Sequence, residues 1–314
     1  MSEQKIPIPA MLYNAAIGGH VTNSQQIIDE NLNREQNDIN QETVGAVPYN
    51  STTPNGMGRI VLKKNDNFKT VVEAQTNGNT IFVIKYDFTL TGDVTIPANC
   101  VLDFDGGSIS GAYTITGTNT GINAVLTKIF NTDVILAGIW NVAEAYPEWF
   151  GNDYTSIKAA IALASCSDKK LVLNGEYILS TNPTGYLFTL PSVFSICGKG
   201  KIKVNDEFGD FGGLFKIPVS ENISIKDITI DENCHNNVRT VFVFDNTNRR
   251  NIFSFGTGKN VHIENVTVLN ISSIWVVEGG GVNNLTINNC KLLECGRNQT
   301  FVTQISRHHL PDGT

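Results

Sequence analysis

Asn222-Ile-Ser-Ile-Lys-Asp-Ile-Thr-Ile230 is a nine-residue phrase that recurs in similar form at residues 260–268 and 284–292. Each copy contains two short alternations of apolar and polar residues, a pattern typical of half-buried β-strands. An Asp or Asn interrupts the alternation in every copy, at Asp227, Asn265 and Asn289. Each copy therefore predicts a strand, a corner and a second strand.

The spacing of the copies indicates how these strands are arranged. The copies begin 38 residues apart (260 minus 222) and then 24 residues apart (284 minus 260). This fits one coil of a parallel solenoid with an insertion and one without. A single coil cannot bury its own apolar side, so coils must stack, and Asn at equivalent corners can form amide ladders. The sequence predicts an all-β fold, a right-handed parallel β-helix with a helical or extended N-terminal arm.

Composition limits the class of protein. The chain has 314 residues, of which 41% are hydrophobic and 17% charged, so it is expected to fold. A net charge of -7, with no run of Lys or Arg longer than two, disfavours nucleic-acid binding. The sequence has no signal-peptide pattern and no stretch of 18 apolar residues, so neither export nor membrane insertion is expected. Its six cysteines lack a CxxC pair and are interpreted as reduced thiols; no metal or cofactor is expected.

The first 47 residues differ from the rest and are predicted to form a docking or oligomerisation arm. A polar helix is expected over Ser24–Val44, with a narrow apolar stripe at Ile28, Leu32 and Ile39. Such a helix buries too little to be stable alone, so it is expected to order against sister chains or another protein. A disordered tail is the alternative. The expected contact residues of the arm are Ile6, Leu12, Ile17, Ile28, Leu32 and Ile39.

Two β-rich domains are predicted after the arm. Residues 48–147 are expected to form a linker and a first small coil domain, with a strand over Arg59–Lys63 and short strands between Thr80 and about Trp140. Residues 148–314 are expected to form the larger β-helix, without an evident trimerising or receptor-binding cap at its end. At its start, Thr155 or Ser156 is expected to cap a helix that plugs the open end of the solenoid. The expected buried face of this helix is Ile157, Ala160, Ile161 and Ala164.

Two stretches carry a resemblance to known families. Residues 153–161 followed by 171–178 resemble the opening of pectate-lyase-like β-helix domains, which are common in bacteriophage tailspikes and fibres. Residues 8–19 with 29–40 are similar to the arms of fibre proteins from crAss-like phages of gut Bacteroidetes. The resemblance implies a homotrimeric virion fibre assembled in the host cytoplasm. Its N-terminus would dock on other virion proteins, and its shaft would serve host attachment, with a host surface glycan as a further partner.

Carboxylate pairs are the candidates for glycan cleavage, which needs two carboxyl groups about 5 to 9 Å apart. Asp103 and Asp105 have the alternation to share a strand face, although the following Gly106-Gly107 favours a corner. Asp206 with Asp210 is a second pair. Asp231 and Glu232, with His235 and Arg239 nearby, form the most polar cluster, which suits a saccharide groove or lyase-like site. A solvated loop is the favoured interpretation of that cluster.

Other motifs predict no chemistry. His308 and His309 lack Cys or carboxylate partners for a metal. Residues 256–260 lack the leading Gly and the Ser/Thr of a phosphate loop. Aromatic packing, and not sugar binding, is expected for Trp149, Phe150 and Trp275.

No residue is committed as catalytic. The leading hypothesis is a structural virion component, a fibre or tailspike subunit with a β-helical shaft. The alternative is a polysaccharide lyase or glycoside hydrolase on the same scaffold, because fold alone does not decide function. A cell-surface adhesion solenoid is a third hypothesis, disfavoured by the missing export signal.

Overall fold

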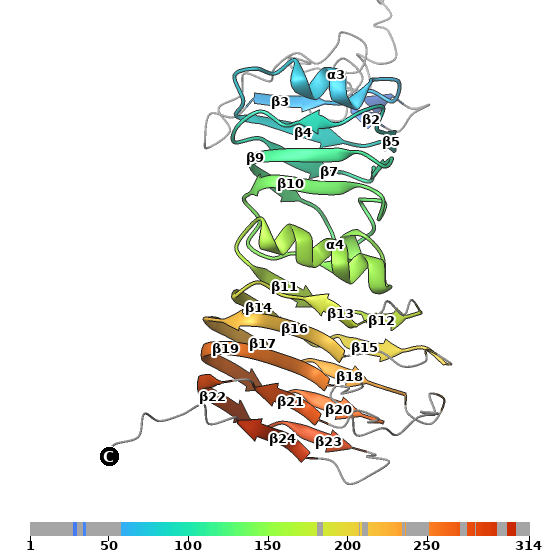
Figure 1. The fold of residues 1–314 in the computed structure, drawn as a ribbon. Coiled ribbons are helices and arrows are strands. Elements are labelled where there is room, and N and C mark those ends of the chain that lie inside the picture. Colours follow the sequence, from blue (N-terminus) through green and yellow to red (C-terminus); the bar gives the residue numbers. More distant parts are fainter. Residues whose placement is uncertain are drawn as a thin grey trace, which may run out of the picture.

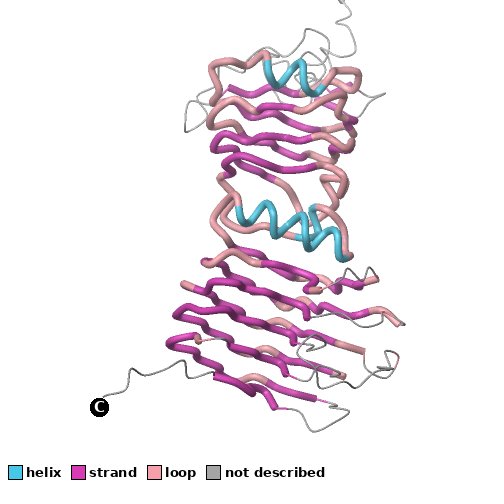
Figure 2. The backbone as a smooth tube through the Cα atoms, in the orientation of Figure 1, coloured by secondary structure: helices cyan, strands magenta, loops and turns pink. Residues whose placement is uncertain are grey.

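The computed structural model describes residues 28–29, 34–35, 58–180, 185–206, 208, 213–233, 236, 251–270, 275–279, 281–293 and 300–305. From residue 58 onward, the described strands pair in parallel and stack into an elongated solenoid (Figures 1 and 2). The predicted parallel β-helix is confirmed. One hydrophobic cluster extends from Ile60 to Val277 and passes without a break through the predicted domain boundary between residues 147 and 148.

The first coils form a six-stranded sheet and a two-stranded sheet. The main stack follows the order β10-β9-β7-β4-β3, with β6 beside β9, and β5 pairs with β8. Each short apolar segment predicted between Ile81 and Thr116 contributes to one of these strands. The strands are β3 (Gly58–Val61), β4 (Thr80–Ile84), β5 (Phe88–Thr89), β6 (Val94–Thr95), β7 (Val101–Phe104), β8 (Ile109–Ser110), β9 (Thr114–Asn123) and β10 (Ile135–Trp140).

A short helix that the sequence analysis missed, α3 (Phe68–Glu73), lies over the N-terminal end of these coils (Figure 1). Asn67 caps it by accepting a hydrogen bond from the Thr70 N–H, and Phe68 and Val72 are buried beneath it. An Asn before apolar residues at positions 68, 71 and 72 was the available signal, because this spacing is that of an amphipathic helix.

Helix α4 (Tyr154–Ser165) lies within the stack, between β10 and β11 (Lys170–Leu173) (Figure 1), and follows the short 3-10 helix η2 (Pro147–Trp149). Its four predicted core residues are buried. The predicted cap was wrong: Asp153 is the N-cap and accepts hydrogen bonds from the Ser156 N–H (2.8 Å) and the Thr155 hydroxyl (2.7 Å). The predicted plug at a solenoid end was also wrong. The preceding coil supplies its own apolar layer, so α4 has coils on both sides. On the side of β10, the backbone N–H of Trp140 donates a hydrogen bond to the carbonyl of Cys166, just after the helix (2.9 Å).

The coils after α4 form three columns of parallel strands. The nine-stranded sheet contains two of the columns and the five-stranded sheet contains the third. The nine-stranded sheet is built from β11 (Lys170–Leu173), β13 (Tyr186–Thr189), β14 (Val193–Gly198), β16 (Gly213–Ser220), β17 (Asn222–Lys226), β19 (Asn251–Glu264), β21 (Trp275–Gly279), β22 (Val282–Asn288) and β24 (Thr300–Ile305). The five-stranded sheet is built from β12 (Glu176–Leu179), β15 (Lys201–Val204), β18 (Thr229–Asp231), β20 (Thr267–Leu269) and β23 (Lys291–Leu293).

The three copies of the repeated phrase occupy equivalent places in successive coils. Ile223 pairs with Val261, which pairs with Leu285. The predicted amide ladders are confirmed at both corners. In each ladder, the later coil donates from Nδ2 to the Oδ1 of the earlier one: Asn260 to Asn222 (3.1 Å), Asn284 to Asn260 (3.1 Å), Asn265 to Asp227 (2.9 Å) and Asn289 to Asn265 (2.7 Å).

The corner conformation explains why Asp or Asn stands there. Asp227, Asn265 and Asn289 have φ of 60°, 54° and 48°, in the left-handed region that Asn and Asp tolerate better than other side-chain-bearing residues. The same hydrogen bond between Asn side chains of successive coils occurs in the first coils, where Asn119 Nδ2 donates to Asn99 Oδ1 at 2.8 Å. These contacts satisfy polar groups at the corners while they fix the register between coils.

Inside the solenoid, an aromatic stack joins α4 to the coils that follow. The ring centroids of Tyr154 and Phe188 lie 5.4 Å apart, those of Phe188 and Phe215 5.4 Å, and those of Phe215 and Phe253 5.6 Å. These separations are within the range of favourable aromatic pairs. The stack makes α4 part of the same core as β13, β16 and β19.

Only four residues of the N-terminal arm are described. Ile28–Asp29 (β1) and Arg34–Glu35 (β2) pair antiparallel. The helix predicted over Ser24–Val44 is therefore wrong at these positions. Its sparse apolar stripe gave little reason for a helix. The other predicted arm contacts, Ile6, Leu12, Ile17, Leu32 and Ile39, lie outside the described residues.

Candidate functional site

Asp103 and Asp105 lie at the end of β7, and their carboxylates contact different partners. The Asp103 carboxylate accepts a hydrogen bond from Asn123 Nδ2 (2.6 Å) and lies 3.3 Å from Arg59 Nη1. Asp105 is exposed, 3.9 Å from Lys85 Nζ, in the turn that contains Gly106 at φ 96°. The expected corner is present, and Asp103 contributes to contacts between coils.

Asp231 is a buried carboxylate, 5% exposed, at the end of β18. It accepts hydrogen bonds from Lys201 Nζ (2.8 Å), Asn270 Nδ2 (2.8 Å) and the Asn233 N–H (3.0 Å). Burial alone raises the pKa of Asp231, but these bonds outweigh burial and hold the pKa below its usual value. Glu232 is also buried. The favoured interpretation of a solvated loop was therefore wrong for both residues.

The other predicted chemical candidates are only partly described. Asp206 is exposed and accepts hydrogen bonds from Asn233 Nδ2 (2.7 Å) and Asn236 Nδ2 (3.0 Å), which lower its pKa. The expected packing role is confirmed for Trp149 and Phe150, which are buried. Residues 256–260 lie within β19, as a strand and not a phosphate loop. The remaining candidates lie outside the described residues: Asp210, His235, Arg239, His308, His309 and the side chain of Trp275.

A titratable cluster that the sequence analysis missed joins the segment just before η2 to the start of β11. Lys170 Nζ is 2.5 Å from Glu144 Oε1, and the Tyr146 hydroxyl donates to Glu144 Oε2. The hydrogen bond from Lys170 lowers the pKa of Glu144, whereas burial and the bond to Glu144 raise the pKa of Tyr146 to about 12. At neutral pH, Glu144 therefore stays ionised and Tyr146 stays neutral. The 26-residue spacing of Glu144 and Lys170, close to one coil, was the only sequence signal.

Glu148 forms a second cluster with the next corner. The buried Tyr177 hydroxyl donates to Glu148 Oε1 (2.7 Å) and accepts from the N–H groups of Asn174 (3.1 Å) and Gly175 (3.2 Å). Burial raises the pKa of Tyr177. This network provides a hydrogen-bond acceptor for the backbone N–H groups at the corner between β11 and β12. It is consistent with a structural role.

The described carboxyl groups share a trend that bears on catalysis. Every one whose pKa is shifted is shifted downward, by hydrogen bonds that outweigh burial wherever burial opposes them. A glycoside hydrolase needs a general acid, which is usually a carboxyl group with a raised pKa. Hydrogen bonds, and in some cases ion pairs, therefore favour the ionised form of these groups. The groups are Glu73, Glu144, Asp153, Asp206, Asp231 and Glu264.

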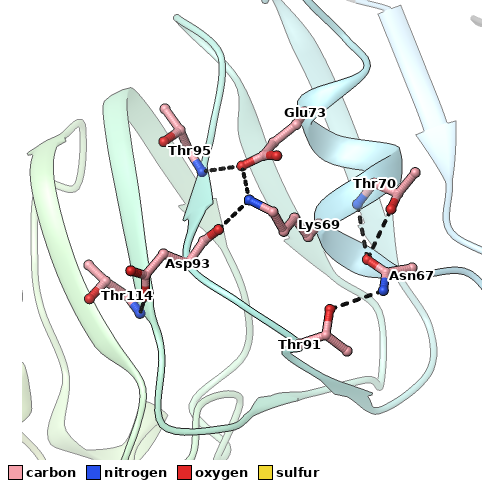
Figure 3. Close-up of polar contacts among 8 residues, drawn as sticks. All are labelled: Asn67, Lys69, Thr70, Glu73, Thr91, Asp93, Thr95 and Thr114. Atoms are coloured by element: carbon pink, nitrogen blue, oxygen red, sulfur yellow. Dashed lines mark hydrogen bonds and ion pairs between the residues drawn. The ribbon is translucent and has the colours of Figure 1, made fainter.

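Helix α3 supplies polar partners to the edge strand β6 (Figure 3). β6 pairs with β9 on one side, and α3 faces its other side. Glu73 Oε1 accepts a hydrogen bond from the Thr95 N–H (3.0 Å), and Lys69 Nζ donates to the Asp93 carbonyl (2.5 Å) and pairs with Glu73 (2.8 Å). Two side chains thus replace the missing neighbouring strand and block pairing with another chain at this edge.

Removing the Glu73 carboxylate should open this edge. In Glu73→Ala, the Thr95 N–H loses its acceptor, and we expect its amide hydrogen exchange to accelerate by roughly fivefold, because one hydrogen bond contributes about 1 kcal/mol. Glu73→Gln is the matched control, since its side-chain oxygen can still accept the bond. Equal exchange rates at Thr95 in Glu73→Ala and the unmodified chain would contradict the proposed capping.

A set of outward polar side chains runs across β14, β17, β19 and β22 in two columns; we call it the polar face. Lys226 Nζ lies 2.9 Å from Glu264 Oε2, and His262 Nε2 lies 3.1 Å from the same oxygen. All of its side chains are at least partly exposed. The parallel register stacks Ser195, Ser224, His262 and Thr286 in one column and Lys226, Glu264 and Asn288 in the next.

Further observations limit what the described residues hold. None of the helices in the described part of the chain is long and apolar enough to cross a membrane. The described residues also contain no group of three His, Cys, Asp or Glu side chains placed to hold a metal ion. The four described cysteines are free thiols, as the sequence predicts, and Cys100 is fully buried.

Comparison with known proteins adds no relative: no protein-family model, curated protein or solved structure matches this chain.

Proposed function

We propose that the chain is a structural component of a bacteriophage virion, a fibre or tailspike subunit whose β-helix is a stiff shaft for host attachment. The observation that carries the proposal is the unbroken core from Ile60 to Val277, with corner side chains bonded from coil to coil. Such a solenoid resists bending because each coil packs and hydrogen-bonds along its whole length. Rigid presentation of a surface at a distance is the mechanical task of a fibre.

The proposed fibre is a homo-oligomer, with a trimer as the expected state, and residues 1–47 dock it on other virion proteins. The polar face is its attachment surface. Its hydroxyl, amide and imidazole groups lie in regular columns. They can donate hydrogen bonds to a host surface glycan and accept hydrogen bonds from it. The ion pair of Lys226 with Glu264 leaves that face without a single dominant charge.

Immunogold electron microscopy tests the virion role directly. Antibodies raised against the purified chain should label fibres on particles of the crAss-like phage that encodes it. Unlabelled particles, from lysates in which the same antibodies detect the chain, would overturn the proposal. The assay does not depend on oligomeric state or on any single residue.

Binding to host cells tests the polar face. Lys226→Ala removes a charged group from this face, and we expect weaker binding of the purified chain to host Bacteroidetes cells. Lys158→Ala, on the exposed side of α4, is the matched control and should bind normally. Equal binding of both variants would remove the polar face from the proposal.

The competing function is a polysaccharide lyase or glycoside hydrolase. The contacts that hold Asp231 and Asp103 to residues of neighbouring coils favour the structural role. Incubation of the chain with acidic capsular polysaccharides separates the two. Release of new reducing ends or unsaturated sugars by the purified chain would establish the enzyme.

A further inference from the structure

The polar face is part of a longer surface, because its two columns continue toward the N-terminal end. Strand β11 pairs with β14, and a bridge joins Ala145, in the segment before η2, to Leu171 on β11. Strands β11, β14, β17, β19 and β22 follow one another from α4 toward the C-terminal end (Figure 1). We call the whole surface the extended polar face. One column is Glu144, Lys170, Ser195, Ser224, His262 and Thr286; the other is Tyr146, Val172, Cys197, Lys226, Glu264 and Asn288.

The charges of the extended polar face form two ion pairs, separated along the shaft. Lys170 Nζ lies 2.5 Å from Glu144 Oε1, and Lys226 Nζ lies 2.9 Å from Glu264 Oε2. Each lysine of this surface is thus paired with a carboxylate on an adjacent coil. An acidic ligand would have to compete with these carboxylates for the lysines, so it gains little attraction here. The charge pattern therefore favours an uncharged ligand.

Between the two ion pairs lies an uncharged strip of small side chains; we call it the short strip. It consists of Val172 and Cys197 in one column and Ser195 and Ser224 in the other. Val172 is 7% exposed, and the other three side chains are partly exposed. Burial raises the pKa of the Cys197 thiol, so the thiol is neutral at neutral pH. The short strip thus places an apolar column beside a column of hydroxyl groups, which both donate and accept hydrogen bonds.

The dimensions of the surface favour a ligand that lies along the shaft. Six coils spaced by about 4.8 Å make the extended polar face about 24 Å long, whereas it is only two columns wide. A chain-like ligand parallel to the shaft axis meets a similar pair of outward positions at every coil. A ligand that crosses the axis meets only the two columns of one or two coils.

We propose that the ligand of the extended polar face is an uncharged glycan chain that lies along the shaft axis, with its middle over the short strip. This proposal rests on the proposed function and names the ligand class of its attachment surface. A sugar ring carries C–H groups on its faces and hydroxyl groups at its edge, so it matches an apolar column beside a hydroxyl column. The Lys and Glu side chains of the two ion pairs donate to and accept from further sugar hydroxyls without adding net charge.

The probes are two fractions of the surface polysaccharide of host Bacteroidetes cells, one uncharged and one acidic, separated by anion exchange. Calorimetric titration of the full chain should show binding of the uncharged fraction. Its affinity should change less than about twofold when salt rises from about 0.15 M to about 1 M, because salt screens only charge attraction. Ser224→Trp, with Ser195→Trp as a second blocking variant, should bind about tenfold more weakly, because the indole occupies the place of a sugar. Thr189→Trp, on β13 and outside the extended polar face, is the matched control and should bind normally.

Three results would overturn the inference. The first is binding of the acidic fraction alone, which would assign the surface to a charged glycan. The second is full binding by both blocking variants with circular dichroism melts like that of the unmodified chain, which would place the ligand elsewhere. The third is binding of neither fraction by a chain that still binds host cells, which would exclude a glycan as the receptor. Each of these results leaves the immunogold test of the virion role unaffected, so the two proposals fail separately.

Discussion

Replacing Phe215 by Ala is expected to lower the free energy of unfolding by about 3 to 5 kcal/mol, the usual range for large aromatic truncations in a core. The Phe215 ring is fully buried and lies between those of Phe188 and Phe253, with centroid separations of 5.4 and 5.6 Å. Its removal leaves a cavity and breaks two aromatic contacts at once. The solenoid relaxes poorly around such a cavity because parallel strands hold the coil spacing.

Urea unfolding followed by circular dichroism measures this effect. Lys216→Ala is the matched control: it lies on the same strand, is exposed and loses only the contact of its Nζ with the Tyr186 ring (5.5 Å to the centroid), so it should change stability by at most about 1 kcal/mol. Phe215→Leu should lie between the two, since it refills part of the cavity. A loss below about 1 kcal/mol for Phe215→Ala would show that the aromatic stack is not part of a continuous core.

The strands and corners were predictable because the information is local. Within the phrase from Asn222 to Ile230, alternation marks the strands, and the Asp at the phase change marks the left-handed corner. Repetition of the phrase then predicts stacking, and stacking predicts that Asn265 and Asn289 bond to each other. Each step uses only residues within one coil and its copy.

The helices show where local information ends. The apolar spacing of α4 predicted its buried face, but whether it ends a solenoid or joins two sets of coils depends on what lies on its far side. Helix α3 is only six residues long, and its stability comes from Phe68 and Val72 packing on the first coils. No isolated helix of that length is stable, so its existence is a property of the stack.

The sequence identified the candidate carboxylates, but their burial and their bonding partners were predicted wrongly. Asp231 contacts Lys201, 30 residues earlier, and Asn270, 39 residues later. These separations differ because the coil between them carries the insertion, so no fixed period connects the three residues. Burial and pairing of a charge on a solenoid depend on the length of each coil, which the sequence shows only where copies of the phrase are clear.

Replacing Asp231 by Asn should destabilise the chain in a pH-dependent way. At pH 7, we expect a loss of about 1 to 3 kcal/mol, because Lys201 loses its carboxylate and the Asn233 N–H retains only a neutral acceptor. The folded-state pKa of Asp231 is lowered, so its contribution is fully present above the unfolded-state pKa of about 3.9 and disappears as pH falls through the folded-state value. The gap between Asp231→Asn and the unmodified chain should therefore shrink between about pH 5 and pH 2.

Urea midpoints at pH 7, 5 and 3 measure that gap. Asp105→Asn is the control, because Asp105 is exposed and its nearest cation, Lys85 Nζ, is 3.9 Å away, so its gap should stay near zero. A gap for Asp231→Asn that keeps its size down to pH 3 would mean that shape and not charge decides its role. A gap that closes would establish Asp231 as an anion that ties three coils together, through Lys201 before it and Asn270 after it. An anion held in that way stabilises the shaft and is poorly suited to donate a proton to a sugar.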